Sequence, residues 1–180
     1  TSFFQSVTTR TAGFNTVDIS ALNVPTLLMF IFLMFIGASP GSTGGGIKTT
    51  TFTVILISVL ATIRNKRNME IGHRTIPHYV SYKAFSIFTF AAVLNLIFIF
   101  VLSITDAQYD ILRVAFEQVS AFATVGLSTG ITAGLSDAGK SVIIMSMYIG
   151  RVGTLTLALA LSTRASSTNH RYPDTHLAVG

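Results

Sequence analysis

The residues best suited to chemistry belong to a short motif, Thr-x-Gly, that the 180-residue chain contains in two equivalent places. Thr11 and Gly13 form the first copy, and Thr124 and Gly126 form the second, 113 residues later. In such a segment, consecutive backbone carbonyls can replace the hydration shell of a cation, because glycine lets the carbonyls turn inward and the threonine hydroxyl adds another oxygen. The spacing therefore indicates two copies of one cation-coordinating segment.

The repeat extends well beyond this motif. At the same offset, FFQSVTTRTAGFNT at 3–16 aligns with FEQVSAFATVGLST at 116–129, and the apolar run at 34–37 aligns with that at 147–150. A repeat of this length indicates a whole structural unit. Each copy begins as a short helix candidate, passes through Thr-x-Gly and continues into a strongly apolar segment. This order is typical of a re-entrant pore loop, which is tolerated at membrane depth only where it lines a watery cavity.

The composition supports a membrane protein. Half of the residues are hydrophobic, 11% are charged, and the chain has fourteen phenylalanines and no cysteine. A soluble domain of this length carries more charge. The absence of cysteine excludes disulfides and thiolate metal sites.

A glycine-rich segment interrupts the first long apolar region. As one helix, residues 26–63 would span roughly 57 Å at about 1.5 Å per residue, nearly twice a hydrocarbon core of about 30 Å. The sequence GASPGSTGGGIK from Gly37 to Lys48 contains five glycines and a proline, which no helix would survive. We expect an upper half-helix, an unwound segment inside the membrane, and a lower half-helix from about Thr49 to Ile63.

Three more helices are expected in the second half of the chain. Residues 84–104 carry no charge over 21 positions and predict a plain transmembrane helix. A second pore helix is expected from about Ile111 to Phe122. A second inner helix is expected from Val142 to Leu161, with Arg151 at its middle. A charge at that depth costs roughly 2.5 to 3.5 kcal/mol, so Arg151 should face the pore or a partner rather than lipid.

These elements predict an all-α integral membrane protein built from repeated helix, pore-loop, helix units with one broken inner helix. The expected parts are a pore helix, filter and broken inner helix at 1–63, a basic linker at 64–83, a complete repeat at 84–162 and a tail at 163–180.

The charges fix the expected orientation. A pore loop enters and leaves on one face, which places four acids on that side: Asp18, Asp106, Asp110 and Asp137. Seven basic residues lie on the other side, against Lys140 alone among the outer loops: Arg64, Lys66, Arg67, Arg74, Lys83, Arg164 and Arg171. This is the positive-inside pattern, so we expect a multi-pass plasma-membrane protein with outward-facing pore loops and a cytoplasmic linker and C-terminus. The formal charge of +5 then reflects orientation and not a nucleic-acid partner.

Four segments carry a family resemblance: TRTAGFNT, FIGASPGSTGGGIKTTTF, FATVGLSTGIT and RYPDTHLAVG. They closely resemble the membrane subunit of Ktr-type potassium uptake systems, in the Trk/Ktr/HKT superfamily. Proteins of that family carry four repeats in one polypeptide, arranged with pseudo-fourfold symmetry around a potassium-channel-like pore. The resemblance implies that this chain is the third pore loop and inner helix followed by the whole fourth repeat. With the N-terminal half missing, two of four filter quadrants remain, and the fragment alone is not expected to conduct.

The resemblance also implies the site residues. The ion-binding filter would use the oxygens of Thr11, Ala12, Gly13 and Phe14 in one quadrant and of Thr124, Val125, Gly126 and Leu127 in the other. Because each filter keeps a single glycine, we expect looser selectivity than in ordinary potassium channels. The gate would lie below the filter and include Gly37, Ser39, Pro40, Gly41, Ser42, Thr43, Gly44, Gly45, Gly46 and Lys48. Arg151 aligns with Ala38 at the start of this gate, and we expect its guanidinium to hydrogen-bond the gate's carbonyls.

The same resemblance implies the partners. Ktr-type subunits form homodimers and are gated by a cytosolic ring of nucleotide-binding subunits, for which the basic linker and the tail are the expected docking sites. Potassium is the implied transported ion, and no cofactor is implied.

Other functions remain to be weighed. A non-conducting assembly protein would use pore-like hairpins only for packing, but packing alone would not place so many unpaired backbone groups at membrane depth. A sodium-permeable member of the superfamily is a second alternative. Proton coupling would want a carboxylate in the inner helices, which have none. An enzyme is not expected, because Glu117 stands alone on its pore helix and no catalytic set converges.

Overall fold

A computed structural model describes residues 2–42, 44–66, 69–71 and 74–153. Within these ranges the chain is helical apart from loops and one short hairpin. The helices are α1 (Ser2–Thr8), α2 (Val24–Phe35), α3 (Thr49–Ile63), α4 (His78–Thr105), α5 (Ile111–Phe122) and α6 (Asp137–Val152), with 3-10 turns at Ile19–Ala21 and Thr132–Gly134. The hairpin pairs β1 (Met69–Ile71) with β2 (Arg74–Ile76) in antiparallel register, with Met69 opposite Ile76.

The apolar region at 26–63 is divided between two helices, as the glycine-rich segment predicts. α2 ends at Phe35 and α3 begins at Thr49. Twelve and fifteen residues make helices of about 18 and 22 Å, so neither crosses a bilayer alone. Among the described helices, α4 is the one long and apolar enough to do so.

Two predicted boundaries move outward. α4 begins at His78, six residues before the expected start, directly after Pro77, whose φ of −64° suits a helix N-terminus. α6 begins at Asp137 because Ser136 caps it, with the Ser136 hydroxyl accepting a 3.0 Å hydrogen bond from the Gly139 N–H. The linker predicted at 64–83 thus contains the hairpin and the first turn of α4.

The end of α6 corrects a prediction. The inner helix was expected to continue to Leu161, but α6 ends at Val152, where Gly153 adopts a φ of 92°. Glycine takes this left-handed conformation readily and ends helices for that reason. Arg151 therefore lies in the last helical turn and not at mid-helix. Residues 154–161 of the predicted helix lie outside the described residues, as does the tail at 163–180.

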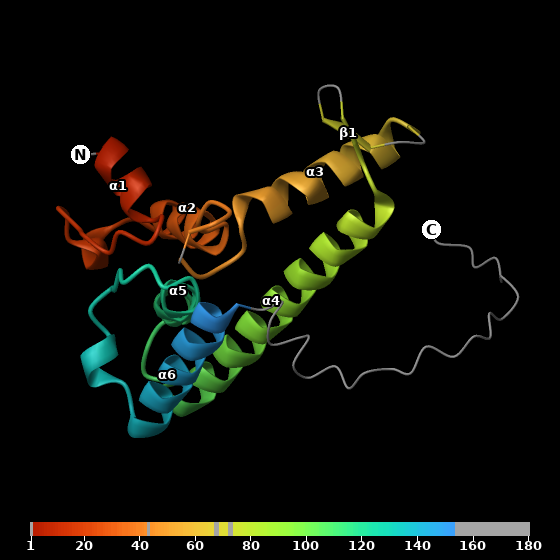
Figure 1. Cartoon of the computed structure of the whole chain (residues 1–180). Coiled ribbons are helices and arrows are strands. Elements are labelled where there is room, and N and C mark those ends of the chain that lie inside the picture. Colours follow the sequence, from red (N-terminus) through yellow and green to blue (C-terminus); the bar gives the residue numbers. More distant parts are fainter. Residues whose placement is uncertain (1, 43, 67–68, 72–73, 154–180) are drawn as a thin grey trace, which may run out of the picture.

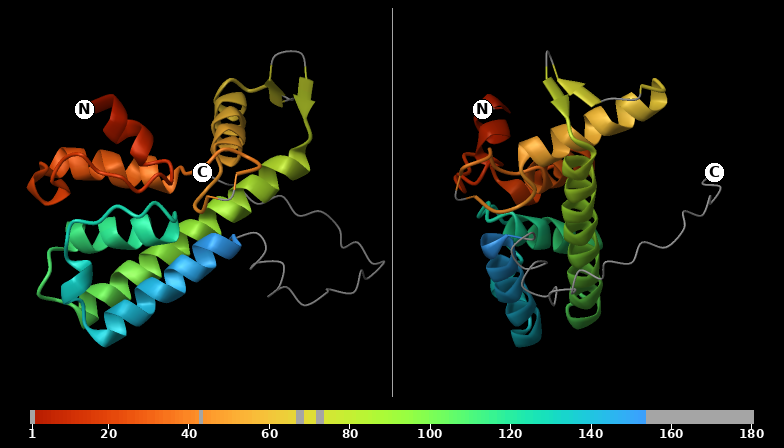
Figure 2. Two further views of the ribbon diagram at one scale, coloured as in Figure 1. Left: turned by 60° about the vertical axis from the view of Figure 1, so that its left-hand side comes forward. Right: turned by 45° about the vertical axis from the view of Figure 1, so that its right-hand side comes forward.

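The helices form one packed group in which α4 and α6 run antiparallel side by side and α5 lies across them (Figures 1 and 2). One cluster of buried residues joins α2 to α5 and includes Phe30, Met34, Phe116 and Val119. A second joins α4, α5 and α6 through Leu102, Val114 and Ile143. The first half of the chain is thus held to the second both through α2, which packs on α5, and through α3, which packs on α4.

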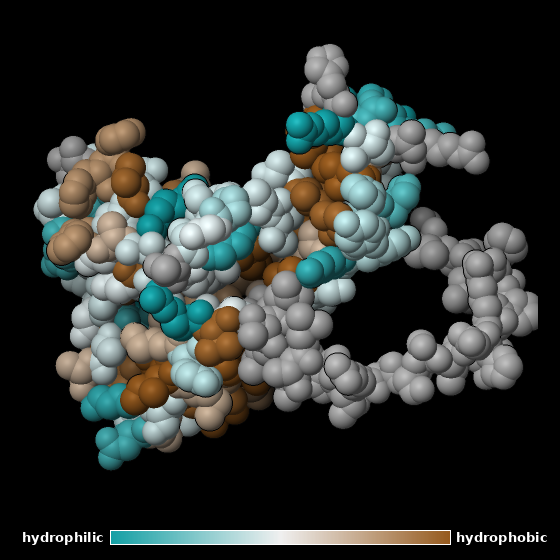
Figure 3. Space-filling view, viewed as in Figure 1, coloured by the Kyte–Doolittle hydropathy of each residue, from teal (hydrophilic) through white to brown (hydrophobic). Residues whose placement is uncertain are grey.

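Apolar side chains also gather in patches on the face of the molecule shown in Figure 3. Leu96 and Phe100 on α4, Ile144 on α6 and Leu60 on α3 are 48–66% exposed. Apolar patches of this extent suit contact with lipid or with further protein.

Candidate ion-conduction site

The two predicted filter segments, residues 11–14 and 124–127, which we call the filter segments, adopt the same unusual backbone conformation. Thr11 and Gly13 have φ of 68° and 73°, and Thr124 and Gly126 have φ of 55° and 88°. A positive φ is rare for a β-branched residue, because the side chain crowds the backbone. Its occurrence at equivalent threonines in both copies indicates a conformation that the surrounding structure imposes.

The two filter segments also lie in contact. A Cβ added to Gly13 would lie 2.8 Å from the Val125 carbonyl oxygen, and one added to Gly126 would lie 3.4 Å from the Cα of Gly13. Backbones approach this closely only where at least one residue lacks a side chain. The fold therefore brings together two segments that are 113 positions apart in the sequence.

Each pore helix holds the end of its filter segment by one hydroxyl group. Thr8 of α1 donates a hydrogen bond to the Phe14 carbonyl, and Ser120 of α5 donates one of 2.6 Å to the Leu127 carbonyl. The carbonyls of Phe14 and Leu127 were predicted to face a cation, but each accepts this bond from the helix behind it. The oxygens of residues 11–13 and 124–126 are the stronger candidates for ion contact.

The glycine-rich segment, residues 36–48, forms a closed loop that we call the glycine loop. Its two ends pair through a parallel bridge between Ile36 and Ile47, and the Gly37 N–H donates a 2.8 Å hydrogen bond to the Ile47 carbonyl. This bridge satisfies backbone groups that the broken helix leaves free. Thr43 lies outside the described residues; the other predicted gate residues from 37 to 48 all belong to this loop.

The glycine loop lies directly against both filter segments. The Gly45 N–H donates a 2.8 Å hydrogen bond to the Thr124 hydroxyl. A Cβ added to Gly44 would lie 2.9 Å from the Thr11 methyl group, and one added to Gly45 would lie 2.8 Å from the Thr124 methyl group. Only glycine fits at these two positions, because the threonine side chains fill the space beside them.

Two cationic side chains bind the loop carbonyls. Lys48 donates from Nζ to the carbonyls of Gly44 at 2.6 Å and Ser42 at 3.1 Å. Arg10, directly before the first filter segment, donates from Nη1 to the Gly37 carbonyl at 3.4 Å. Arg10 was not among the residues predicted for the site, although its position beside Thr11 could have suggested it.

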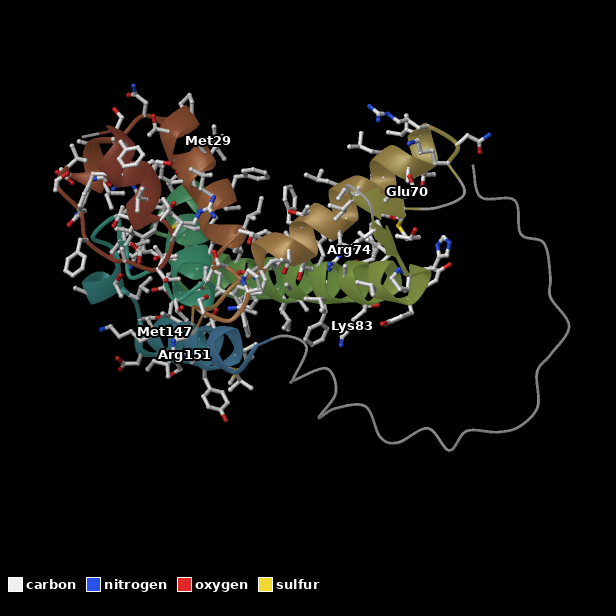
Figure 4. The ribbon with its side chains drawn as sticks, turned by 45° about the horizontal axis from the view of Figure 1, so that its top comes forward. Met29, Glu70, Arg74, Lys83, Met147 and Arg151 are labelled. Atoms are coloured by element: carbon white, nitrogen blue, oxygen red, sulfur yellow. The ribbon has the colours of Figure 1, made fainter. Side chains whose placement is uncertain are left out.

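Arg151 is exposed in the last turn of α6, one turn beyond Met147 (Figure 4). Its neighbour Gly150 packs so tightly on α5 that an added Cβ would lie 1.8 Å from the Phe122 carbonyl oxygen. The predicted bond from Arg151 to the glycine loop stays a prediction.

Glu117 was expected to stand alone, and the structure corrects this. Its side chain is buried, and its carboxylate accepts hydrogen bonds from three residues that follow the second filter segment: Ser128, Thr129 and Thr132. These partners are 11–15 positions away in the sequence, so no local pattern indicates them.

A pocket of about 420 Å³ opens beside the second filter segment. Thr124, Gly126 and Glu117 line it on one side, and Met147 of α6 lines it on the other. Met34, which matches Met147 in the repeat, is fully buried in the cluster that joins α2 to α5. Met147, by contrast, is 47% exposed.

Oxygen atoms of the backbone and of threonine are the candidate cation ligands in this region. Within the described ranges, no group of three or more acidic, histidine or cysteine side chains could hold a metal ion. Potassium is bound in filters by carbonyl oxygens, which is the ligand type that the two segments present.

Comparison with known proteins identifies the class. Residues 1–171 match the TrkH family, described as cation transport proteins, and the chain therefore belongs to that family of membrane transporters and not to an enzyme family. The chain is 43% identical over 179 residues to the Ktr system potassium uptake protein B of Bacillus subtilis, covering 99% of this chain and 40% of that protein. It is 40% identical to the potassium/sodium uptake protein NtpJ of Enterococcus hirae, covering 99% of this chain and 41% of that protein.

The fold has a solved counterpart. The crystal structure of the potassium transporter TrkH from Vibrio parahaemolyticus matches with a TM-score of 0.73 and 25% identity, over 88% of this chain and 36% of that one. This match confirms the predicted class of all-α membrane fold. The chain spans about 40% of the length of the curated relatives it matches.

Proposed function

We propose that this chain supplies two quadrants of a potassium-uptake pore together with the gate beneath them. The observation that carries the proposal is the contact of one loop with both filter segments, through Gly44 beside Thr11 and Gly45 beside Thr124. A loop in this position obstructs a cation that leaves either filter segment. Withdrawal of the loop would open the path.

Potassium is the proposed ion, because the most similar relatives include potassium uptake proteins and the candidate ligands are carbonyl oxygens. Sodium permeation is the second candidate, favoured by the similarity to NtpJ, whose name includes both ions. The single glycine in each filter segment leaves less freedom to orient carbonyls, so we expect weaker discrimination between the two ions than a filter with two glycines gives.

The proposed gate works by hydrogen bonds that opening must break. Lys48 holds the carbonyls of Gly44 and Ser42, while Thr124 holds the N–H of Gly45. Deleting residues 42–45 should raise the potassium flux and weaken its regulation. A deletion variant that folds and conducts like the parent, still fully regulated, would instead identify the loop as a static kink.

Arg151 is the proposed latch of this gate. Its position in the repeat matches Ala38, at the start of the glycine loop, and its helix packs on the end of α5 through Gly150. Arg151→Gln should then raise the flux per folded protein. If Arg151 serves a structural pair instead, the same substitution should lower expression and flux together.

The remaining quadrants would come from the part of the protein that precedes this chain in its relatives. In the repeat, Met147 stands where Met34 is buried against a pore helix, so the pocket beside Met147 is the expected seat of another pore-loop unit. The complete protein is proposed to form a homodimer in the plasma membrane, with filters facing outward, and to be gated by a cytosolic nucleotide-binding ring.

Potassium uptake by the full-length protein tests the proposal. Expressed in a host that lacks its own potassium uptake, the protein should restore growth at low potassium. After purification and reconstitution, it should carry potassium into liposomes. Full-length protein that inserts and folds but carries neither potassium nor sodium would favour the assembly role.

A further inference from the structure

Glu117 is a buried carboxylate for which cation conduction through backbone carbonyls has no direct use. It lies on α5, is 6% exposed, and accepts four hydrogen bonds. Oε1 accepts from the Ser128 hydroxyl at 2.7 Å, the Thr129 N–H at 2.7 Å and the Thr129 hydroxyl at 3.0 Å, and Oε2 accepts from the Thr132 hydroxyl at 2.8 Å. Four bonds fill the acceptor capacity of a carboxylate.

The donors of these bonds follow directly after the second filter segment. Thr129 is two residues beyond Leu127, whose carbonyl is itself held by Ser120 of the same helix at 2.6 Å. The chain leaving the filter is therefore fastened to α5 at two successive levels, first by Ser120 and then by Glu117. Hydrogen bonds to a charged acceptor are the stronger kind, so the second attachment is the firmer one.

The first copy of the repeat lacks this attachment. Phe4 stands at the position of Glu117. Gln5 donates one 3.2 Å hydrogen bond from Nε2 to the Thr16 hydroxyl, and its buried Oε1 has no partner in the described part of the chain. The two filter segments share a backbone conformation and a hydroxyl bond to their last carbonyl, but the carboxylate attachment follows the second segment and not the first.

We infer that Glu117 is a positioning residue that fixes the outer half of the second filter segment and so contributes to selectivity between potassium and sodium. Sodium is the smaller ion, and carbonyls must move inward to bind it as closely as they bind potassium. A filter segment held at residue 127 by Ser120, and directly beyond its end at residues 128 and 129 by Glu117, resists that movement, whereas a segment released by loss of Glu117 follows it. This inference rests on the proposed function, since it concerns the same filter.

Two substitutions in the full-length protein distinguish the positioning role of the Glu117 side chain from an effect of its negative charge. Glu117→Ala removes all four acceptors. Glu117→Gln retains one oxygen for Ser128 and Thr129 and can donate to the Thr132 hydroxyl, so it keeps the geometry but removes the charge. Asp137→Ala, an exposed acid on α6, is the matched control. The readout is the ratio of potassium to sodium initial uptake rates in liposomes, per folded protein.

We expect Glu117→Ala to lower this ratio about tenfold, which corresponds to about 1.4 kcal/mol in the relative free-energy barrier to uptake of the two ions, while Glu117→Gln and Asp137→Ala stay near the parent. An unchanged ratio in Glu117→Ala overturns the inference, as does an equal fall in Glu117→Gln, which would assign the effect to charge. If Glu117→Ala does not fold, Thr132→Val removes one donor at an exposed position and should lower the ratio in part; no change there also overturns it.

Gly126→Ser, measured in parallel, shows whether an unchanged ratio contradicts only the positioning role of Glu117 or also the assignment of residues 124–127 as a filter. A lower ratio in Gly126→Ser beside an unchanged ratio in Glu117→Ala overturns the positioning role alone. An unchanged ratio in Gly126→Ser removes the filter assignment and the role of Glu117 with it.

Discussion

The backbone N–H of Gly45 donates a 2.8 Å hydrogen bond to the hydroxyl of Thr124, from a residue 79 positions earlier in the chain. The same hydroxyl belongs to the second filter segment, where it is a proposed cation ligand. The glycine loop and the filter therefore share one oxygen atom. In the proposed gate, withdrawal of the loop would release this oxygen from the Gly45 N–H.

Thr124→Val tests this shared oxygen. Valine keeps the shape of threonine but cannot accept the bond from Gly45, so the closed loop loses one hydrogen bond worth roughly 1 kcal/mol and the flux through the inactive protein should rise about fivefold. Thr124→Ser keeps the hydroxyl and should remain closed. The measurement is potassium efflux from liposomes without activating partner; equal efflux from the valine variant and the parent would argue against the bond as part of the gate.

Gly45→Ala tests the fit of the loop beneath the filter. The added methyl group would lie 2.8 Å from the Thr124 methyl and 2.9 Å from the Phe122 carbonyl, so the loop must shift away from the filter. We expect a higher basal potassium flux from protein that still folds. Ser141→Ala, at an exposed position of α6 outside the loop, should leave the flux unchanged. Equal basal flux in the two variants would show that the loop does not seal the path there.

Gly150→Ala tests the packing of α6 on the end of α5. Its Cβ would lie 1.8 Å from the Phe122 carbonyl oxygen, which belongs to the backbone and cannot rotate away. Overpacking of this kind costs about 1–3 kcal/mol or more, so the melting temperature of the purified full-length protein should fall clearly. Ser141→Ala, exposed on the same helix, should not change it. If Gly150→Ala melted at the same temperature as Ser141→Ala, α5 and α6 would not be in contact in the purified protein.

Asp106 gives a prediction about pH. It is 2% exposed in the loop after α4, outside the membrane-spanning segments, and accepts bonds from the Ser136 N–H at 2.7 Å and hydroxyl at 3.0 Å and from the Thr105 hydroxyl at 2.8 Å. Burial raises its pKa, but these bonds and the charge of Lys140 outweigh burial and lower the pKa below its ordinary 3.8. A lowered pKa gives stability that is present above the ordinary value and is lost as the pH falls through the folded value.

Thermal unfolding of the full-length protein between roughly pH 6 and pH 3 checks this sign. The parent should lose stability toward the acid end, and Asp106→Asn, which cannot ionise, should lose less over the same range. Parallel pH profiles for the two proteins would remove Asp106 as a source of acid sensitivity.

The parts of the fold that follow from local composition could be predicted from the sequence. Five glycines and a proline in twelve residues predict the break between α2 and α3, and α5 occupies the range expected for the second pore helix. The end of α6 at Gly153 could not be predicted, because one glycine in an apolar run is compatible with a continuous helix. The hairpin at 69–76 was also missed, since its strands are only three residues long.

Some features of the candidate site could likewise be predicted from the sequence, and others could not. The repeat identifies the two filter segments, because equivalent residues recur at a fixed offset. The partners of Glu117 and the bonds of Arg10 and Lys48 depend on how loops fold back in three dimensions, and no residue pattern encodes those distances. Arg151 was placed at mid-helix because the predicted helix continued past Gly153.

Gly13 and Gly126 are the residues through which the proposed ion-selective filter is tested most directly. Both have positive φ, and Gly13 lies against the backbone of residue 125, so serine at either position strains the conformation and displaces carbonyls. The direct measurement is potassium uptake by full-length Gly13→Ser and Gly126→Ser, in competition with sodium, in a host that lacks its own potassium uptake. We expect both variants to be expressed like the parent but to prefer potassium less. Unchanged selectivity in both would contradict it.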